Sequence, residues 1–554
     1  MGAKCSLNRV IRFRMTIDMN EPEAPARAVG DWIVLVALGA GALACVLLVV
    51  PYRSFDLDRF FAPKEVALHA AALVAGTAAL LTARRFAMAR ADLALIAWIA
   101  LSALSALFVT NRPLAFRALA VTVSGAAVFW SARRLATARL APALVRVLSL
   151  AILAGAVTAL AQAYGVKMEF AALNRAPGGM FGNRNFMAHL TAAGVPLLLW
   201  CIASARRKGG ALFWTASLAV CAAALVLSRT RAAWLALAVS AVLAVIAVMS
   251  GPPLLESADL RRRMRRAVVA VAAGVVLAIV LPNSLDWRSD SPYLDSVRGV
   301  VDYRGGSGRG RLAQYANSAR MSAAHPLLGV GPGNWAVIYP KFAPPGDPSL
   351  SETTGMAANP WPSSDWVAAL SERGLAAFFA MAAFVVLLLG AALKARYEVT
   401  RSPSERLAAL AGGGIVLIAA LEGVFDAVLL LPTPLIVVLA AAGALIAPGS
   451  ERRAFSPALG RKLLLGGAFA AFTLIAFVTG ERRIEAMRLY EVGTAAALES
   501  ALSKDPGSYR VQMHAADSFA SRNQCAKARA HALTARELFP YSPAPRRVLS
   551  QCRG

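Results

Sequence analysis

The chain has 554 residues, of which 58% are hydrophobic, and its formal net charge at pH 7 is +27. Soluble globular domains are nearer half apolar and lack repeated apolar runs of about 20 residues, so this composition excludes a soluble protein. Lys and Arg stand in short clusters between apolar runs, which favours a role in membrane topology over a nucleic-acid partner. Because lipid cannot satisfy an open sheet edge, the expected fold class is all-α, a polytopic helical membrane protein.

Apolar runs predict about 12–13 transmembrane helices, arranged in two groups around one large polar loop. Residues 1–30 form an N-terminal segment, 31–282 hold nine spans, 283–364 form the loop, 365–479 hold the last spans and 480–554 form a soluble tail. The predicted spans are 31–50, 65–82, 91–109, 114–131, 143–163, 185–204, 211–228, 232–249, 267–282, 365–393, 407–426, 428–447 and 463–479.

Basic clusters occupy every second loop, the densest being the five arginines within residues 261–266. The positive-inside rule therefore predicts a cytoplasmic N-terminus. It also places the loop 283–364 and the tail 480–554 on the exported side, because they follow an odd number of spans.

The tail shows a weak repeat at 34 residues, in the pairs Leu498/Ala532, Ala501/Ala535 and Pro506/Pro540. This pattern resembles about one and a half tetratricopeptide repeats. Fewer than three repeats are marginal alone, so we expect the tail to pack on the membrane part or on a partner.

The chain has six cysteines, none of which forms a CxxC motif, so neither a metal nor another cofactor is expected. Cys525 and Cys552 both lie in the tail, where an oxidising compartment would permit a disulfide.

The first candidate stretch is Gly178–Leu190, at the exported start of the sixth span. Arg184 lies at the water boundary, and Asn185 and His189 share one helical face. Ionisable groups at this depth usually face the bundle interior, so His189 is a candidate proton carrier. The alternative is a histidine that only hydrogen-bonds to a neighbouring helix.

The second stretch is the tight exported turn Leu227–Leu237, which carries Arg229 and Arg231 against the general charge pattern. The planar guanidinium fork suits phosphate or carboxylate. Snorkelling to lipid headgroups is the alternative for one of the two.

The third stretch lies in the large loop, where arginines surround the Gly-rich turn 305–310. Such a turn can bind phosphate, and a flexible linker is the alternative. The arginines are Arg304, Arg309, Arg311 and Arg320.

The fourth stretch opens the tenth span at Asp365, which Ser363 or Ser364 could cap. An Asp is favourable at a helix N-terminus, so a capping role and a chemical role both remain open for Asp365. Glu422 and Asp426, near the exported end of the eleventh span, could pair with the arginines.

Together these stretches resemble the O-antigen ligase and polymerase superfamily of bacterial envelope glycosyltransferases. The matching segments follow the family's order between about residues 181 and 432: FGNRNFMAHL, SRTRAAWLAL, GRGRLAQYANSARMSAAHPLLGVGPGNW, SSDWVAALSERGL and VFDAVLLLP. The resemblance implies metal-independent, inverting transfer of a glycan from a polyprenyl-diphosphate carrier to lipid A core, a growing glycan or a protein. It places the reaction on the periplasmic face of the bacterial inner membrane.

Carried over residue by residue, the resemblance implies that Arg231 and Arg311 clamp the diphosphate. Further candidates for substrate binding are Arg184, Arg229, Arg320, Asn185 and Asp426.

The family's usual general base is a His at the start of the helix after the loop, and here Ser363 and Ser364 stand in that place. Serine without a partner is a poor base at neutral pH, so Asp365 and His189 are the candidates to replace it, with Ser363 the third catalytic candidate. His325 is a further, weaker substitute. The alternative is a non-catalytic protein that holds lipid-linked glycan while its tail recruits a protein partner.

Overall fold

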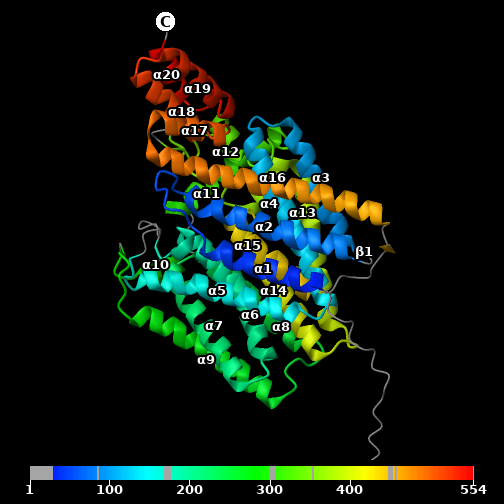
Figure 1. The fold of residues 1–554 in the computed structure, drawn as a ribbon. Coiled ribbons are helices and arrows are strands. Elements are labelled where there is room, and N and C mark those ends of the chain that lie inside the picture. The colour runs from blue at the N-terminus through cyan, green and yellow to red at the C-terminus, as the bar shows by residue number, and fades with distance from the viewer. Residues whose placement is uncertain are drawn as a thin grey trace, which may run out of the picture.

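A computed structural model describes residues 29–83, 86–167, 176–287, 289–299, 306–351, 355–446, 453–455 and 458–552. Most of the predicted N-terminal segment and Arg304 lie outside these residues. The described chain is built almost entirely from α-helices, which confirms the predicted all-α class (Figure 1).

Eleven of the described helices are long and apolar enough to cross a membrane. They are α1 (Val29–Leu47), α2 (Asp58–Thr82), α3 (Arg90–Ser105, continued by the 3-10 turn η1, Ala106–Phe108), α4 (Arg112–Thr137), α5 (Ala141–Ala163), α6 (Arg184–Ser204), α7 (Lys208–Ser228), α8 (Arg231–Met249), α13 (Asp365–Tyr397), α14 (Pro403–Phe425) and α16 (Leu459–Val492). The two other predicted spans also coincide with helices, the Arg-rich α9 (Ala258–Val280) and the short α15 (Pro432–Leu445). A polytopic helical membrane protein is therefore confirmed.

Helix α15 forms the centre of the bundle. All of its residues are buried, as expected for a helix that is apolar on every side. It packs against α4, α14 and α1, and it lies between these helices in Figure 1. A Cβ on Gly443 would lie 2.3 Å from the Phe129 carbonyl oxygen, so glycine lets α15 and α4 approach backbone to backbone.

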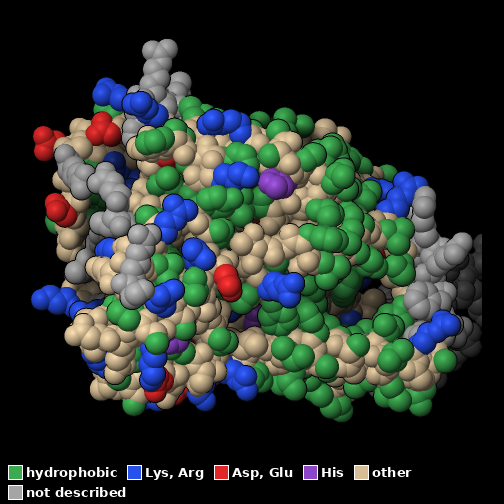
Figure 2. Space-filling view, turned by 90° about the horizontal axis from the view of Figure 1, so that it is seen from above, with side chains coloured by type: hydrophobic (Ala, Val, Ile, Leu, Met, Phe, Trp, Pro, Cys, Tyr) green, Lys and Arg blue, Asp and Glu red, His purple; other side chains and the backbone are tan. Residues whose placement is uncertain are grey.

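Apolar side chains cover the outside of the bundle, as lipid contact requires. Val242 on α8, Val268 on α9 and Leu464 on α16 are all largely exposed. In Figure 2 a broad hydrophobic area separates charged side chains at one end of the molecule from a second group at the other. This distribution fits a membrane belt between two aqueous faces.

Two helices extend beyond the predicted spans. Helix α2 begins at Asp58 rather than at residue 65, and α16 continues to Val492, across the tail boundary predicted at 480. The extra turns carry Asp58 and Arg483, both of which form ion pairs. Hydropathy ends where these charges begin, but paired charges let the helices continue.

The described residues of the large loop contain three helices: α10 (Pro292–Arg298), α11 (Gly306–Ala324) and α12 (Trp335–Ile338, followed by η4, Tyr339–Lys341). Helix α11 ends just before the Gly- and Pro-containing turn 325–334. A small antiparallel pair, β1 (Phe86–Met88) and β2 (Arg453–Phe455), was not predicted. It joins the segment after α2 to the segment before α16.

The tail forms four helices: α17 (Ala495–Lys504), α18 (Tyr509–Ser521), α19 (Cys525–Leu538) and α20 (Ala544–Gln551). Helices α18 and α19 pack together and bury Ala516, Phe519, Ala528 and Ala535 in a shared core. Relation to tetratricopeptide repeats stays a prediction.

The tail is docked on the membrane part, as expected. Asn111 Nδ2, at the start of α4, donates to the Leu538 carbonyl at 3.2 Å. The Ser54 N–H donates to Glu491 Oε1 at 2.7 Å. Cys525 and Cys552 form a disulfide that ties the start of α19 to the end of α20.

Candidate functional site

Asp426, the residue after α14, is the meeting point of three distant segments. Asn185 Nδ2 donates to Asp426 Oδ2 at 3.0 Å, and His189 Nε2 lies 3.3 Å from the same oxygen. Arg311 from α11 approaches it at 3.5 Å. One carboxylate therefore joins a membrane helix, the end of another helix and the large loop.

A second carboxylate lies behind this group. His189 Nδ1 is 3.3 Å from Glu422 Oε1, and the side chains of His189 and Glu422 are both 0% exposed. The Asp426 side chain is 11% exposed. Of these three side chains, only that of Asp426 has exposed surface, and the imidazole connects it to the buried Glu422.

The sequence 182–185 builds the start of α6 beneath this cluster. Gly182 has φ +65°, and a Cβ there would lie 2.3 Å from the Phe60 ring, so the turn requires glycine. Asn183 caps α6 by accepting from the Asn185 N–H at 3.0 Å. This cap orients the first turn, from which Asn185 and His189 both reach Asp426, as their shared helical face predicts.

The predicted arginines of the α7–α8 turn lie beside Asn185. The Thr230 hydroxyl donates to Asn185 Oδ1 at 3.2 Å. Arg229 Nε donates to Ser296 Oγ at 2.8 Å, and Arg231 donates to the Gly299 carbonyl oxygen. Arg184 lies within electrostatic range of Arg229 and Arg231. Three guanidinium groups thus gather where the loop meets the bundle.

Asp365 lies beside the cluster, within electrostatic range of His189 and Glu422. Its carboxylate accepts backbone N–H groups from Val428, Leu429 and Leu430, at 3.0, 2.8 and 3.3 Å. It thereby fixes the turn that follows Asp426. These contacts are those of a positioning residue.

Ser363 and Ser364, which precede α13, are also held by hydrogen bonds. Ser364 caps α13, accepting from the Val367 N–H at 3.3 Å, while its hydroxyl donates to the Gly423 carbonyl at 2.8 Å. The Ser363 N–H donates to Gln314 Oε1, and the Ser363 carbonyl accepts from the Tyr315 hydroxyl, each at 2.6 Å.

Arg320 lies apart from the cluster. It donates to Asn317 Oδ1, and Asn317 Nδ2 in turn donates to Tyr339 Oη at 3.1 Å and to Asp347 Oδ2 at 2.6 Å. Burial raises the pKa of Tyr339 to about 12, so its hydroxyl stays protonated and donates to Asp347. Arg320 thus belongs to a network internal to the loop. The weaker candidate His325 is exposed.

The turn 325–334 serves as a docking element. The Val330 N–H donates to the Ser371 carbonyl at 3.0 Å, and the Gly331 N–H donates to the Glu372 carbonyl at 2.7 Å. These contacts form where α13 is broken at Gly374, which has φ +79°. The turn 325–334 therefore joins the loop to α13.

Sequence reasoning missed Thr230 and a second group of charges. Arg117 on α4 pairs with Asp58 at 2.6 Å and with Glu65 at 2.8 Å. Arg483 pairs with Glu65 at 3.3 Å and lies 3.9 Å from Asp505. The sequence signal that could have identified this second group is the presence of charged residues inside a predicted span and at its flanks. The described residues include no His, Cys, Asp or Glu group arranged to hold a metal ion.

Fold and site together define a polytopic α-helical membrane protein with a buried carboxylate–histidine cluster beside arginines. Residues 216–382, from α7 to the middle of α13, match the family model described as O-antigen ligase. The match covers under a third of the chain and includes Arg229, Arg231, Arg311 and Asp365. It supports, in general terms, glycan transfer of the O-antigen ligase or polymerase kind. No curated protein matches the chain.

Proposed function

We propose that this protein transfers a glycan from a polyprenyl-diphosphate carrier to an acceptor, as O-antigen ligases do. The observation that carries the proposal is the convergence of Asn185, His189 and Arg311 on Asp426, whose side chain is 11% exposed. A carboxylate that can take a proton then lies beside arginines that can hold an anionic leaving group. The match of residues 216–382 to the O-antigen ligase model supports the same reading.

In the proposed reaction Arg311 and the three arginines beside Asn185 hold the diphosphate. An acceptor hydroxyl attacks the anomeric carbon from the opposite side, its proton passes to Asp426, and the bond to the diphosphate oxygen breaks. The diphosphate leaves with the electron pair, which the arginines stabilise. This single displacement inverts the anomeric centre.

His189 and Asp365 act as positioning residues in this proposal. His189 is fully buried and contacts Asp426 and Glu422, so it orients Asp426 and stabilises its charge. Asp365 holds the backbone of residues 428–430 and thereby fixes the turn after Asp426. Asp426 thus takes the role of general base that Asp365, His189 and Ser363 were expected to fill.

The location is part of the proposal. The basic loops support an exported site, on the periplasmic face of the bacterial inner membrane. The acceptor is lipid A core, a growing glycan or a protein.

A deletion strain tests this function. Its polyprenyl-linked glycans, lipopolysaccharide, capsule and glycoproteins would be compared with those of strains restored with the wild-type gene, D426N, or the control D290N, which changes an exposed loop aspartate. Full-length glycan stranded on the carrier marks a ligase or protein transferase, and single repeat units mark a polymerase. D290N should restore the wild-type pools and D426N should not. Restoration by D426N would contradict the proposal.

A second candidate is a non-catalytic protein that binds lipid-linked glycan, favoured by Ser363 at the family's histidine position. It predicts that D426N restores every pool, whereas removal of the tail does not.

A further inference from the structure

A large cavity of about 1100 Å³ lies on the other side of the turn that carries Asp426. Its floor lies among the membrane helices and is apolar, with Val121, Leu435 and Leu439 among its lining residues. Its mouth is charged and aromatic and includes Trp361 and Tyr509. An apolar floor with a polar mouth matches an amphipathic ligand.

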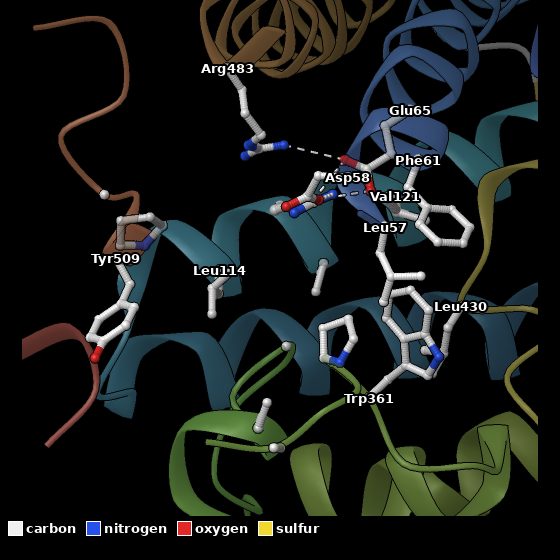
Figure 3. A pocket seen from close by; sticks show the side chains of 18 of the residues that line it. Leu57, Asp58, Phe61, Glu65, Leu114, Val121, Trp361, Leu430, Arg483 and Tyr509 are labelled. Atoms are coloured by element: carbon white, nitrogen blue, oxygen red, sulfur yellow. Dashed lines mark hydrogen bonds and ion pairs between the residues drawn. The ribbon is translucent and has the colours of Figure 1, made fainter. Parts of the chain in front are cut away.

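The tail forms one side of the mouth. Figure 3 shows Tyr509, from the tail, on one side of the hollow and Trp361 and Leu430 on the other, with Arg483 reaching from α16 to Glu65. Asp505, at the end of α17, also lines the cavity and lies 3.9 Å from Arg483. The tail is therefore a wall of this cavity.

The charges at the mouth do not favour a diphosphate. Six arginines and seven carboxylates line the cavity: Arg59, Arg117, Arg373, Arg483, Arg510 and Arg547 against Asp56, Asp58, Glu65, Asp365, Glu372, Asp505 and Asp517. This group has no positive excess, in contrast to the three arginines beside Asn185. Aromatic rings together with ionised side chains suit a polyhydroxylated head group, because the rings offer apolar faces and the charged groups form strong hydrogen bonds.

The same segments separate the cavity from the carboxylate–histidine cluster at Asp426. Asp365 and Leu429 line the cavity, and the Leu429 N–H donates to Asp365, three residues beyond Asp426. Gly182 also lines it, three residues before Asn185. A ligand in the cavity therefore contacts the segments that position Asp426, the proposed base. It approaches them from the side opposite the three arginines beside Asn185.

We propose that this cavity is the acceptor site, that it takes a lipid-anchored saccharide, and that the tail is the wall that recognises its sugar. This inference rests on the proposed function above and assigns the second substrate. The source that fits this chemistry is an acyl-anchored glycolipid, because a polyprenyl-linked glycan carries the diphosphate that the charges at the mouth do not favour.

Photo-crosslinking in cells tests the assignment. The photoreactive residue p-benzoylphenylalanine would replace Tyr509 or Trp361, on opposite sides of the cavity, and, as the control, the exposed tail residue Tyr541. After irradiation, mass spectrometry identifies the adduct on purified, folded protein. We expect a lipid-anchored saccharide at both cavity positions and none at Tyr541. V121W, which fills the floor, should reduce the adduct at least tenfold, whereas V242W on the outer face should not.

The anchor in the adduct decides the source: acyl chains support a glycolipid acceptor, whereas a polyprenyl chain would overturn the proposal. A peptide, a phospholipid alone or no adduct at both cavity positions would also overturn it. None of these crosslinking results changes the comparison of glycan pools in the D426N strain, which tests the proposed function. The acceptor-site proposal and the proposed function can therefore be contradicted separately.

Discussion

His189 Nε2 lies 3.3 Å from Asp426 Oδ2, while His189 Nδ1 lies 3.3 Å from Glu422 Oε1. One imidazole thus bridges two carboxylates inside a membrane bundle, where an ionisable group is costly unless paired. The bridge fixes the end of α14 against α6. It also determines how Asp426 is presented to the loop.

H189Q should destabilise the protein as well as lower transfer. Removing the imidazole leaves Glu422 without its partner in a fully buried site, and breaking a buried pair costs about 3–5 kcal/mol. Thermal unfolding of the detergent-solubilised protein measures the loss. H325Q, at an exposed loop position, is the control and should leave the midpoint unchanged. Equal stability of the two variants would contradict the buried pairing.

R311A and R320A should separate the cluster from the loop network. Arg311 approaches Asp426 at 3.5 Å, whereas Arg320 bonds to Asn317. Losing a charge-stabilising donor typically lowers turnover about 10²–10³-fold, and we expect a loss of this order for R311A. R320A should keep most of its transfer per folded molecule. Glycan transfer is measured in membranes that contain each variant and is normalised to the amount of protein. Similar losses in both variants would indicate that Arg320 also belongs to the substrate site.

D365N should lower stability more than transfer. The Asp365 carboxylate accepts three backbone N–H groups, and an amide offers a single acceptor oxygen for them. An unsatisfied buried group costs about 1–3 kcal/mol. The measurements are the thermal midpoint and transfer per folded molecule. A normal midpoint combined with complete loss of transfer would instead make Asp365 the base.

G374A should disrupt the docking of the 325–334 turn. Gly374 has φ +79°, and a Cβ there would lie 2.1 Å from the Leu327 carbonyl oxygen. Backbone strain of this kind costs about 1–3 kcal/mol, before any loss of packing. G390A, on the same helix with open space around it, is the matched control. Limited proteolysis of the loop reports the docking, and equal cleavage of both variants would count against it.

The tail disulfide should be present in cells. Cys525 and Cys552 are 27 residues apart, and closing such a loop typically contributes about 2–4 kcal/mol. Trapping cells with N-ethylmaleimide and mapping peptides by mass spectrometry should recover the linked pair. C525S with C552S should loosen α20 and increase proteolysis of the tail. Recovery of both thiols reduced would contradict the pairing and the exported location of the tail.

The sequence alone determined the membrane helices and the segments that carry polar chemistry. Apolar length and basic clusters predict each span because lipid imposes them residue by residue along the chain. The spacing of Asn185 and His189 also places both on one face, since a helix repeats locally. The charged ends of α2 and α16 were not predicted from hydropathy. A helix continues through charged residues when partners elsewhere in the chain pair with them.

Only the tertiary structure decided between chemically similar groups. Asp365 and Asp426 are both aspartates at helix ends, yet one is occupied by three backbone N–H groups and the other meets a histidine and an arginine. Asn185 finds Asp426 across 241 residues, a pairing that no local pattern encodes. The docking of the tail over the cavity has the same origin. Local sequence fixes helix and hydropathy through short-range forces, whereas the partner of a buried polar group depends on which helices pack together.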